Sequence, residues 1–152
     1  PGAPKLPLRP VRGQVLRLRG ETLIRHFVRT PDCYIVPRNG GEMLIGATAQ
    51  EAGFDVRAEA GGVLDLLRNA WIVIPGISEL EFVGAFVGFR PTLRDGLPAL
   101  GATETPGLWI ATGHFRHGVM LTPITSKGMI DLIRQQKPST DLAAFSPARF
   151  AP

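Results

Sequence analysis

The first part of the chain alternates between apolar and polar residues. Leu16 and Leu18 fall on one side of an extended backbone, whereas Arg17 and Arg19 fall on the other. A period of two is typical of a β-strand with one buried face. The alternation therefore predicts a strand over residues 14–19.

Three more strand-like segments follow, at residues 23–29, 33–37 and 43–48. The last two are separated by Asn39-Gly40, a pair that supplies the positive φ angles of a tight hairpin turn. From this order we predict an antiparallel meander over residues 13–48.

The hydrophobic period changes to that of a helix over residues 58–74, and Pro75-Gly76 predicts its end. Six apolar residues share one helical stripe and are predicted to be buried: Val63, Leu66, Leu67, Ala70, Trp71 and Ile74. A bulky apolar segment then predicts a strand over residues 80–90. The sequence so far predicts a sheet covered by a helix.

The C-terminal part contains shorter segments. We predict a loop at 91–98, a brief buried strand at 108–112, a glycine-flanked turn at 113–118 and a helix over 119–134. Pro123 fits that helix only near its first turn. Residues 138–152 are predicted to be an irregular tail, in which Phe145 and Phe150 pack against the rest of the chain. Together these elements predict an α+β fold.

Composition adds limits to this picture. The 152 residues are 44% hydrophobic and 20% charged, which is ordinary for a globular protein. No apolar run approaches the ~20 residues of a membrane-spanning helix, so no transmembrane segment is predicted. Cys33 is the only cysteine and can form no internal disulfide, which is compatible with the cytoplasmic location that we expect.

Positive charge is concentrated near the N-terminus. Residues 1–31 contain six arginines and Lys5 but only one acidic residue, Glu21. Such a segment can attract nucleic acid or a membrane surface. Because these arginines alternate with apolar residues, we interpret them as a solvated strand face or as a face covering an acidic partner, and we predict no nucleic-acid binding.

Three local patterns could carry chemistry. The turn at 113–118 precedes a helix, and the unpaired backbone N–H groups and dipole of a helix N-terminus favour an anionic oxygen. Arg90 ends an apolar strand and could bind a carboxylate through its guanidinium fork. Tyr34 could offer its hydroxyl to a ligand. Taken alone, each pattern is more typical of ordinary structure: a tight turn, a solvated arginine and a packed tyrosine, respectively.

Motifs for other chemistries are missing. The sequence contains no Gly-x-Gly-x-x-Gly turn and no phosphate-binding loop. His114 and His117 have no third ligand close by in the sequence, so no metal site is predicted.

Taken in order, six short motifs resemble one protein family. The chain closely resembles the C-terminal half of the glycine oxidase (thiamine-biosynthesis) branch of the FAD-dependent D-amino-acid oxidase superfamily over residues 7–150. The motifs are Val11-Arg12-Gly13-Gln14, Tyr34-Ile35-Val36-Pro37-Arg38, Gly46-Ala47-Thr48, Gly88-Phe89-Arg90-Pro91, Asp95-Gly96-Leu97-Pro98 and Gly113-His114-Phe115-Arg116-His117-Gly118.

The resemblance implies a flavin-dependent oxidase of glycine, sarcosine or small D-amino acids, which forms an imine by hydride transfer to FAD and uses oxygen as the acceptor. It assigns substrate binding to Arg90, Tyr34 and Arg116. It places Ala49 and Asp32 along the pocket. Relatives can carry a larger residue at the position of Ala49, and some relatives carry a histidine at the position of Asp32. It assigns the flavin's pyrimidine edge to Gly113, His114, Phe115, Arg116, His117, Gly118, Val119 and Met120.

The same resemblance implies a division of the chain and a missing partner. Residues 1–90 would be the substrate-binding part, residues 91–137 the C-terminal strand and helix of an FAD-binding domain, and residues 138–152 the tail. The dinucleotide-binding half lies outside this sequence, so the FAD site is incomplete. We expect association with that missing segment or chain, or self-association. A related D-amino-acid dehydrogenase and a flavin-free remnant or interaction subunit remain alternatives.

Overall fold

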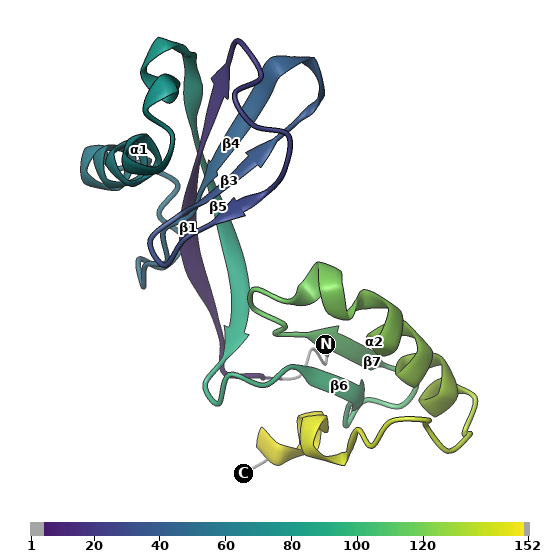
Figure 1. Cartoon of the computed structure of the whole chain (residues 1–152). Helices are drawn as coiled ribbons and strands as arrows, with labels where there is room; N and C mark the ends of the chain where they lie inside the picture. The colour runs from purple at the N-terminus through teal and green to yellow at the C-terminus, as the bar shows by residue number, and fades with distance from the viewer. Residues whose placement is uncertain (1–4, 151–152) are drawn as a thin grey trace. The chain divides into compact units, whose positions relative to one another are not determined.

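The computed structural model of the chain describes residues 5–150, so the remaining residues of the predicted N-terminal part (1–4) and tail (151–152) lie outside the description. The described residues form an α+β fold with a five-stranded sheet, a two-stranded sheet and two α-helices (Figure 1). The predicted fold class is therefore confirmed at this level.

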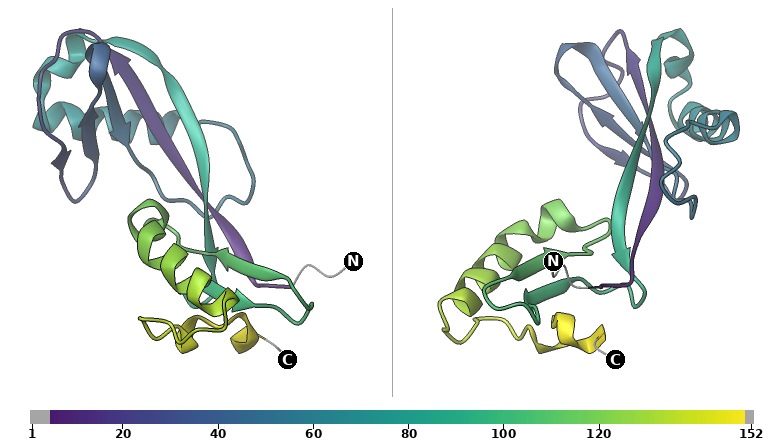
Figure 2. Two further views of the ribbon diagram at one scale, coloured as in Figure 1. Left: turned by 90° about the vertical axis from the view of Figure 1, so that its right-hand side faces the viewer. Right: turned by 180° about the vertical axis from the view of Figure 1, so that it is seen from behind.

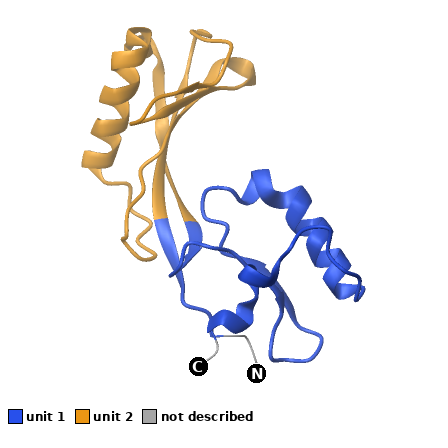
Figure 3. Ribbon diagram, turned by 60° about the horizontal axis from the view of Figure 1, so that its bottom comes forward, with its two compact units in different colours: residues 1–11, 90–152 blue, residues 12–89 orange. Residues whose placement is uncertain are grey.

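The chain divides into two units, shown in different colours in Figure 3. Unit 1 contains residues 1–11 and 90–152, and unit 2 contains residues 12–89. The division falls inside strands β1 (Leu8–Arg19) and β5 (Glu81–Leu93), so both strands contribute to each unit. The predicted assignment of these parts to substrate and flavin domains stays a prediction.

Strand β1 lies inside the five-stranded sheet. The strand order is β2-β3-β4-β1-β5, where β2 is Val28–Arg29, β3 is Tyr34–Pro37 and β4 is Glu42–Gly46. The meander prediction is correct for β2 to β4, but wrong for β1, which pairs antiparallel with β4. Residues 23–27, the first part of the strand predicted at 23–29, form no strand, and β4 lies between β3 and β1 in the sheet.

Helix α1 (Ala60–Val73) covers one face of the sheet in unit 2 (Figure 2). Full burial of one large aliphatic side chain contributes ~1.5–3 kcal/mol, so this layer supplies the main stability of unit 2. The buried core contains Leu16, Leu18, Cys33, Ile35, Met43, Ile45, Leu66, Ala70 and Ile77.

Trp71 differs from its prediction. It was expected on the buried stripe of the helix, but it is 52% exposed. Leu66 and Ala70 face the sheet and are buried. The predicted stripe of six residues is wider than the part of a helix that one sheet face covers, so Trp71 stays exposed. Trp71 lines an apolar groove of about 470 Å³ together with Leu64 and Phe82.

The opposite face of the sheet carries the alternating arginines Arg17 and Arg19. Their side chains are 38% and 51% exposed and lie 3.7 and 3.5 Å from a Glu42 oxygen. The guanidinium of Arg17 lies 4.8 Å from the centre of the Phe86 ring. These two arginines therefore occupy a partly solvated strand face, as the alternation predicted.

Unit 1 contains an antiparallel pair, β6 (Ala99–Ala102) and β7 (Trp109–Thr112), next to helix α2 (Gly118–Ile133). Strand β6 was not predicted, because its Ala-Leu-Gly-Ala sequence lacks the β-branched and aromatic residues typical of strands. The loop prediction at 91–98 is wrong at its start, since β5 continues to Leu93. Strand β7 is only partly buried.

The C-terminal tail packs within unit 1, as its aromatic residues predicted. It forms two short 3-10 turns, Ala143–Phe145 and Pro147–Phe150. A β-carbon at Gly128 of α2 would lie 2.7 Å from Leu142 Cδ1, so Leu142 sits directly against the helix backbone. Neither α1 nor α2, the helices of the described residues, is long and apolar enough to cross a membrane.

Candidate functional site

The turn between β7 and α2 lies beside the strand segment that contains Arg90. The Phe115 N–H donates a hydrogen bond of 3.0 Å to the Pro91 carbonyl, and Thr92 and His114 form an isolated antiparallel bridge. Two patterns found separately in the sequence, Arg90-Pro91 and the turn at 113–118, are thus brought together within unit 1.

Gly113 begins this turn in a conformation that favours glycine. Its φ angle is +83°, and a β-carbon there would lie 2.8 Å from Leu93 Cδ1 and 3.5 Å from Pro98 Cα. Phe115 also has a positive φ, 52°, which is uncommon for a bulky residue. The backbone of the turn is therefore held in an unusual conformation by its neighbours.

We expect Gly113→Ala to destabilise unit 1 by about 2–4 kcal/mol, because left-handed strain and overpacking add. Gly107→Ala is the matched control, since Gly107 has a φ of +80° but no neighbour within 4 Å of a β-carbon. It should cost only the strain, about 1–2 kcal/mol. Urea unfolding followed by Trp109 fluorescence, with Trp71 replaced by Phe, measures both. Equal losses would contradict the steric contribution.

His114 links the turn to helix α2. Its Nε2 lies 3.0 Å from Thr125 Oγ1. Partial burial lowers the pKa of the His114 imidazole below its ordinary value, because burial disfavours the charged form. The His117 N–H donates a hydrogen bond of 3.0 Å to the His114 carbonyl, at the point where the turn leads into α2.

The other residues predicted at the flavin edge are more exposed. Arg116 is exposed, and its guanidinium carbon lies 5.7 Å from the centre of the Phe115 ring. Val119 and Met120, in the first turn of α2, are 93% and 69% exposed. The N-terminal end of α2 therefore combines backbone N–H groups with accessible apolar side chains.

Three predicted site residues lie in unit 2. Tyr34 points away from α1, because its neighbour Ile35 faces the core, and its ring covers Gly46 so closely that a β-carbon there would overlap it. Asp32 is exposed in the turn before β3 and donates its N–H to Thr30 Oγ1 at 3.3 Å. Ala49 is exposed after β4. Their roles at a substrate pocket stay predictions.

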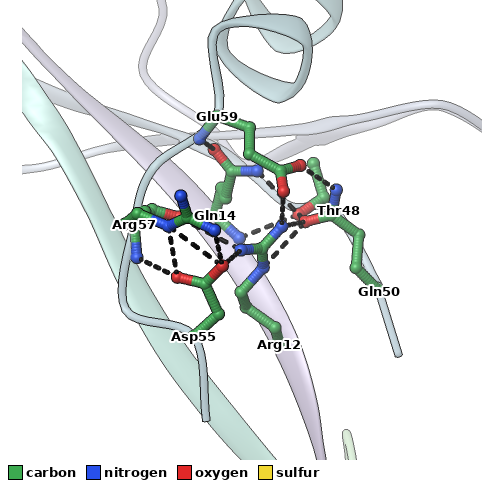
Figure 4. Close-up of polar contacts among 7 residues, drawn as sticks. All are labelled: Arg12, Gln14, Thr48, Gln50, Asp55, Arg57 and Glu59. Atoms are coloured by element: carbon green, nitrogen blue, oxygen red, sulfur yellow. Dashed lines mark hydrogen bonds and ion pairs between the residues drawn. The ribbon is translucent and has the colours of Figure 1, made fainter. Parts of the chain in front are cut away.

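The sequence reasoning missed a polar cluster centred on Arg12, drawn in Figure 4. Arg12 is only 1% exposed. Its Nη2 lies 2.7 Å from Glu59 Oε1, its Nε and Nη2 donate to Gln50 Oε1 at 3.2 and 3.1 Å, and its Nη1 donates to the Arg57 carbonyl at 3.2 Å. A buried cation is therefore paired and hydrogen bonded.

Gln14 joins the same cluster to the start of α1. Its side chain is fully buried, its Nε2 donates to Gln50 at 3.0 Å, and its Oε1 accepts the N–H of Glu59, the N-cap residue, at 3.0 Å. A β-carbon at Gly62 would lie 2.8 Å from the Gln14 Cδ. The cluster thus fixes the loop after β4 and the beginning of the helix to β1.

The carboxylates of this cluster are held in their charged form. The hydrogen bond from Arg57 keeps the pKa of Asp55 far below its ordinary value, and the hydrogen bond from Arg12 lowers the pKa of Glu59. The sequence contained a usable signal. Arg12 and Gln14 share the parity of Leu16 and Leu18, so the strand prediction, extended backwards, places them on the buried face.

No His, Cys, Asp and Glu side chains of the described part of the chain form a group that could hold a metal ion.

Comparison with known proteins shows the family of the chain. Residues 1–132 match the model of the family described as "FAD dependent oxidoreductase". The chain belongs to this family. Within the FAD dependent oxidoreductases, it is 41% identical over 143 residues to glycine oxidase from Geobacillus kaustophilus, which is 92% of this chain and 38% of that protein. It is 36% identical over 149 residues to the bifunctional protein ThiO/ThiG of a Nostoc species, covering 95% and 23%.

The fold agrees with a solved member of the FAD dependent oxidoreductases. The crystal structure of glycine oxidase from Geobacillus kaustophilus superposes with a TM-score of 0.87 at 39% identity, over 97% of this chain and 41% of that one. The chain thus spans less than half the length of the relatives it matches.

The residues at the start of α2 fit the flavin that the family uses. A flavin has an apolar ring system and a pyrimidine edge that becomes negative on reduction. Val119 and Met120 offer exposed apolar contact, while the first N–H groups of the helix offer donors to an anion. The assignment of Gly113 to Met120 to the FAD edge stays a prediction.

Proposed function

We propose that this chain is the substrate-binding and flavin-edge part of an FAD-dependent oxidase of glycine, sarcosine or small D-amino acids. The observation that carries the proposal is the joining of the Arg90-Pro91 segment to the turn at 113–118 by the hydrogen bond from Phe115 to Pro91. A carboxylate-binding cation and a flavin-edge turn then belong to one unit. The glycine oxidase name of a 41% identical relative supports the substrate class.

In this proposal Arg90 binds the substrate carboxylate. A guanidinium presents two parallel donors to a carboxylate, which fixes orientation as well as position. Arg90 is half-buried on β5, so its charge is screened less than that of a surface arginine. Arg116, in the same unit, supplies a further donor to the anionic substrate, while the roles of Tyr34, Ala49 and Asp32 in unit 2 stay predictions. Placement of the substrate is the main contribution of these residues.

The turn and α2 act on the cofactor side. When bound, FAD would supply the hydride acceptor for oxidation of the substrate carbon. The backbone donors at the start of α2 and the positive end of the α2 dipole would stabilise negative charge at the pyrimidine edge. His114 contributes a hydrogen-bonded connection from the turn to Thr125.

The proposal requires a partner. The relatives contain more than twice the length of this chain, so a further segment or second chain supplies the dinucleotide-binding part. Val119, Met120 and Ile124 are 93%, 69% and 48% exposed on α2, and such accessible apolar side chains favour association, with that part or with another copy.

The test is spectroscopic. The purified chain is mixed with the N-terminal part of a glycine oxidase relative and FAD, and bound flavin is followed by its absorbance. Glycine or sarcosine should bleach the flavin under anaerobic conditions, and oxygen should restore the colour. Bleaching without reoxidation by oxygen would indicate a dehydrogenase. Bound flavin that no small amino acid reduces would contradict the oxidase, and a stable flavin-free oligomer would favour an interaction subunit.

A further inference from the structure

The C-terminal tail contributes one arginine whose donors are extensively used. Arg149 Nε lies 2.7 Å from Asp95 Oδ2, and Nη2 lies 3.3 Å from Asp95 Oδ1. Nη2 also donates to the Leu97 carbonyl at 2.9 Å. Nη1 donates to the carbonyls of Phe145 and Ser146 at 2.9 and 3.1 Å. With its side chain 19% exposed, Arg149 joins the tail to the loop after β5.

The Asp95 carboxylate also organises its own loop. Its Oδ1 accepts the Leu97 N–H at 3.1 Å, and the Gly96 N–H donates to the Leu93 carbonyl at 3.0 Å. Gly96 has a φ of +75°, so the tight turn depends on glycine. The hydrogen bond from Arg149 lowers the pKa of Asp95 below its ordinary value. The loop is therefore held in place by the ion pair between Arg149 and Asp95, in which two guanidinium nitrogens contact the two carboxylate oxygens.

This loop is in direct contact with the flavin-edge turn. Leu93 is fully buried, and Leu93 Cδ1 and Pro98 Cα lie 2.8 and 3.5 Å from the place of a β-carbon on Gly113. Residues 93 and 98 are the two ends of the loop that Arg149 closes. A change in the loop is therefore transmitted by packing to Gly113, within one unit of the chain.

We propose that Arg149 is a positioning residue for the flavin-edge turn. It holds the loop at 93–98, and through Leu93 and Pro98 it holds Gly113 and the backbone donors that follow. Its effect on the flavin rests on the proposed function, whereas its effect on the turn does not.

The turn can be tested in the isolated chain by amide hydrogen exchange and NMR titration. Arg149→Met should raise the exchange rate of the Phe115 amide at least ten-fold, leave the amides of β3 and β4 unchanged, and move the pKa of Asp95 up toward its ordinary value. Arg149→Lys keeps the charge but not the two-point geometry, so it should restore the low pKa of Asp95 more than the slow exchange of Phe115. Arg94→Met, an exposed arginine in the same loop, is the control and should change neither.

The outcomes separate the two proposals. Asp95→Asn, which removes the charge but keeps the size, should reproduce the faster Phe115 exchange if Arg149→Met does not fold. Unchanged Phe115 exchange in Asp95→Asn and in a folded Arg149 variant would overturn the positioning role.

In the flavin-bound complex, Arg149→Lys should shift the flavin absorbance and weaken FAD binding, while KM for glycine stays within about two-fold. An unaltered flavin spectrum would limit the role of Arg149 to the loop and so contradict the proposal, whereas absence of flavin from the wild-type complex would contradict only the proposed function.

Discussion

Replacing Arg90 with leucine should raise the KM for glycine about 100-fold or more in the complex of this chain with its flavin-binding part. Truncating one partner of a buried, hydrogen-bonded charge pair costs ~2–5 kcal/mol, and each 1.4 kcal/mol is a factor of ten. Arg90→Lys should recover only part of the loss, because an ammonium lacks the planar fork that binds both carboxylate oxygens. Steady-state oxygen consumption over a wide range of glycine concentrations measures the effect.

The control for Arg90 is Arg94→Leu, which removes an exposed arginine four residues further along the chain. It should leave KM within about two-fold. Circular dichroism of each variant tests whether unit 1 is still folded. An Arg90→Leu enzyme that folds, binds flavin and keeps the wild-type KM would show that the carboxylate is bound elsewhere.

Replacing Arg12 with methionine should destabilise unit 2 by about 2–4 kcal/mol. The substitution removes the hydrogen-bond donors of a side chain that is 1% exposed. The side-chain oxygen of Gln50 and the carbonyl oxygen of Arg57 then lose their hydrogen bonds from Arg12. Glu59 loses less, because its side chain is 49% exposed and regains water. Urea unfolding followed by Trp71 fluorescence, with Trp109 replaced by Phe, measures the loss.

Arg19→Met is the matched control on the same strand, since Arg19 is 51% exposed and lies 3.5 Å from its acidic partner. A surface pair of this kind contributes at most about 1 kcal/mol. The double variant Arg12→Met with Glu59→Gln should lose less than the sum of the single losses, because the two residues interact. Equal losses of stability in Arg12→Met and Arg19→Met would contradict the argument that burial makes the contacts of Arg12 more stabilising than those of Arg19.

The fold was predictable where one face of an element is distinct from the other. The parity of Leu16 and Leu18 predicted β1, and the helical stripe around Leu66 and Ala70 predicted α1. Strand β6 was not predictable from its small residues, and the position of β1 beside β4 depends on pairing that no local pattern contains. Tertiary pairing, not propensity, decides both.

The candidate site was predictable as parts but not as an arrangement. The turn at 113–118 and Arg90 each had a chemical signature, but the hydrogen bond from Phe115 to Pro91 joins residues far apart in sequence. The pair Arg149 and Asp95 is separated by 54 positions, and nothing local to the tail indicates it. The Arg12 cluster was missed because the arginines of residues 1–31 were interpreted together as a solvated face, although Arg12 has the parity of the buried Leu16 and Leu18.

The division of the chain has a consequence for the order of folding during synthesis. Unit 2 is one continuous segment, residues 12–89, whereas unit 1 needs both its first strand residues and everything after residue 90. Domains generally fold as units from the N-terminus while the ribosome adds ~5–20 residues per second. Unit 2 can therefore fold before residues 90–152 have been translated, which takes roughly 3–13 seconds at that rate. The beginning of β1 must wait over that interval for the rest of its unit.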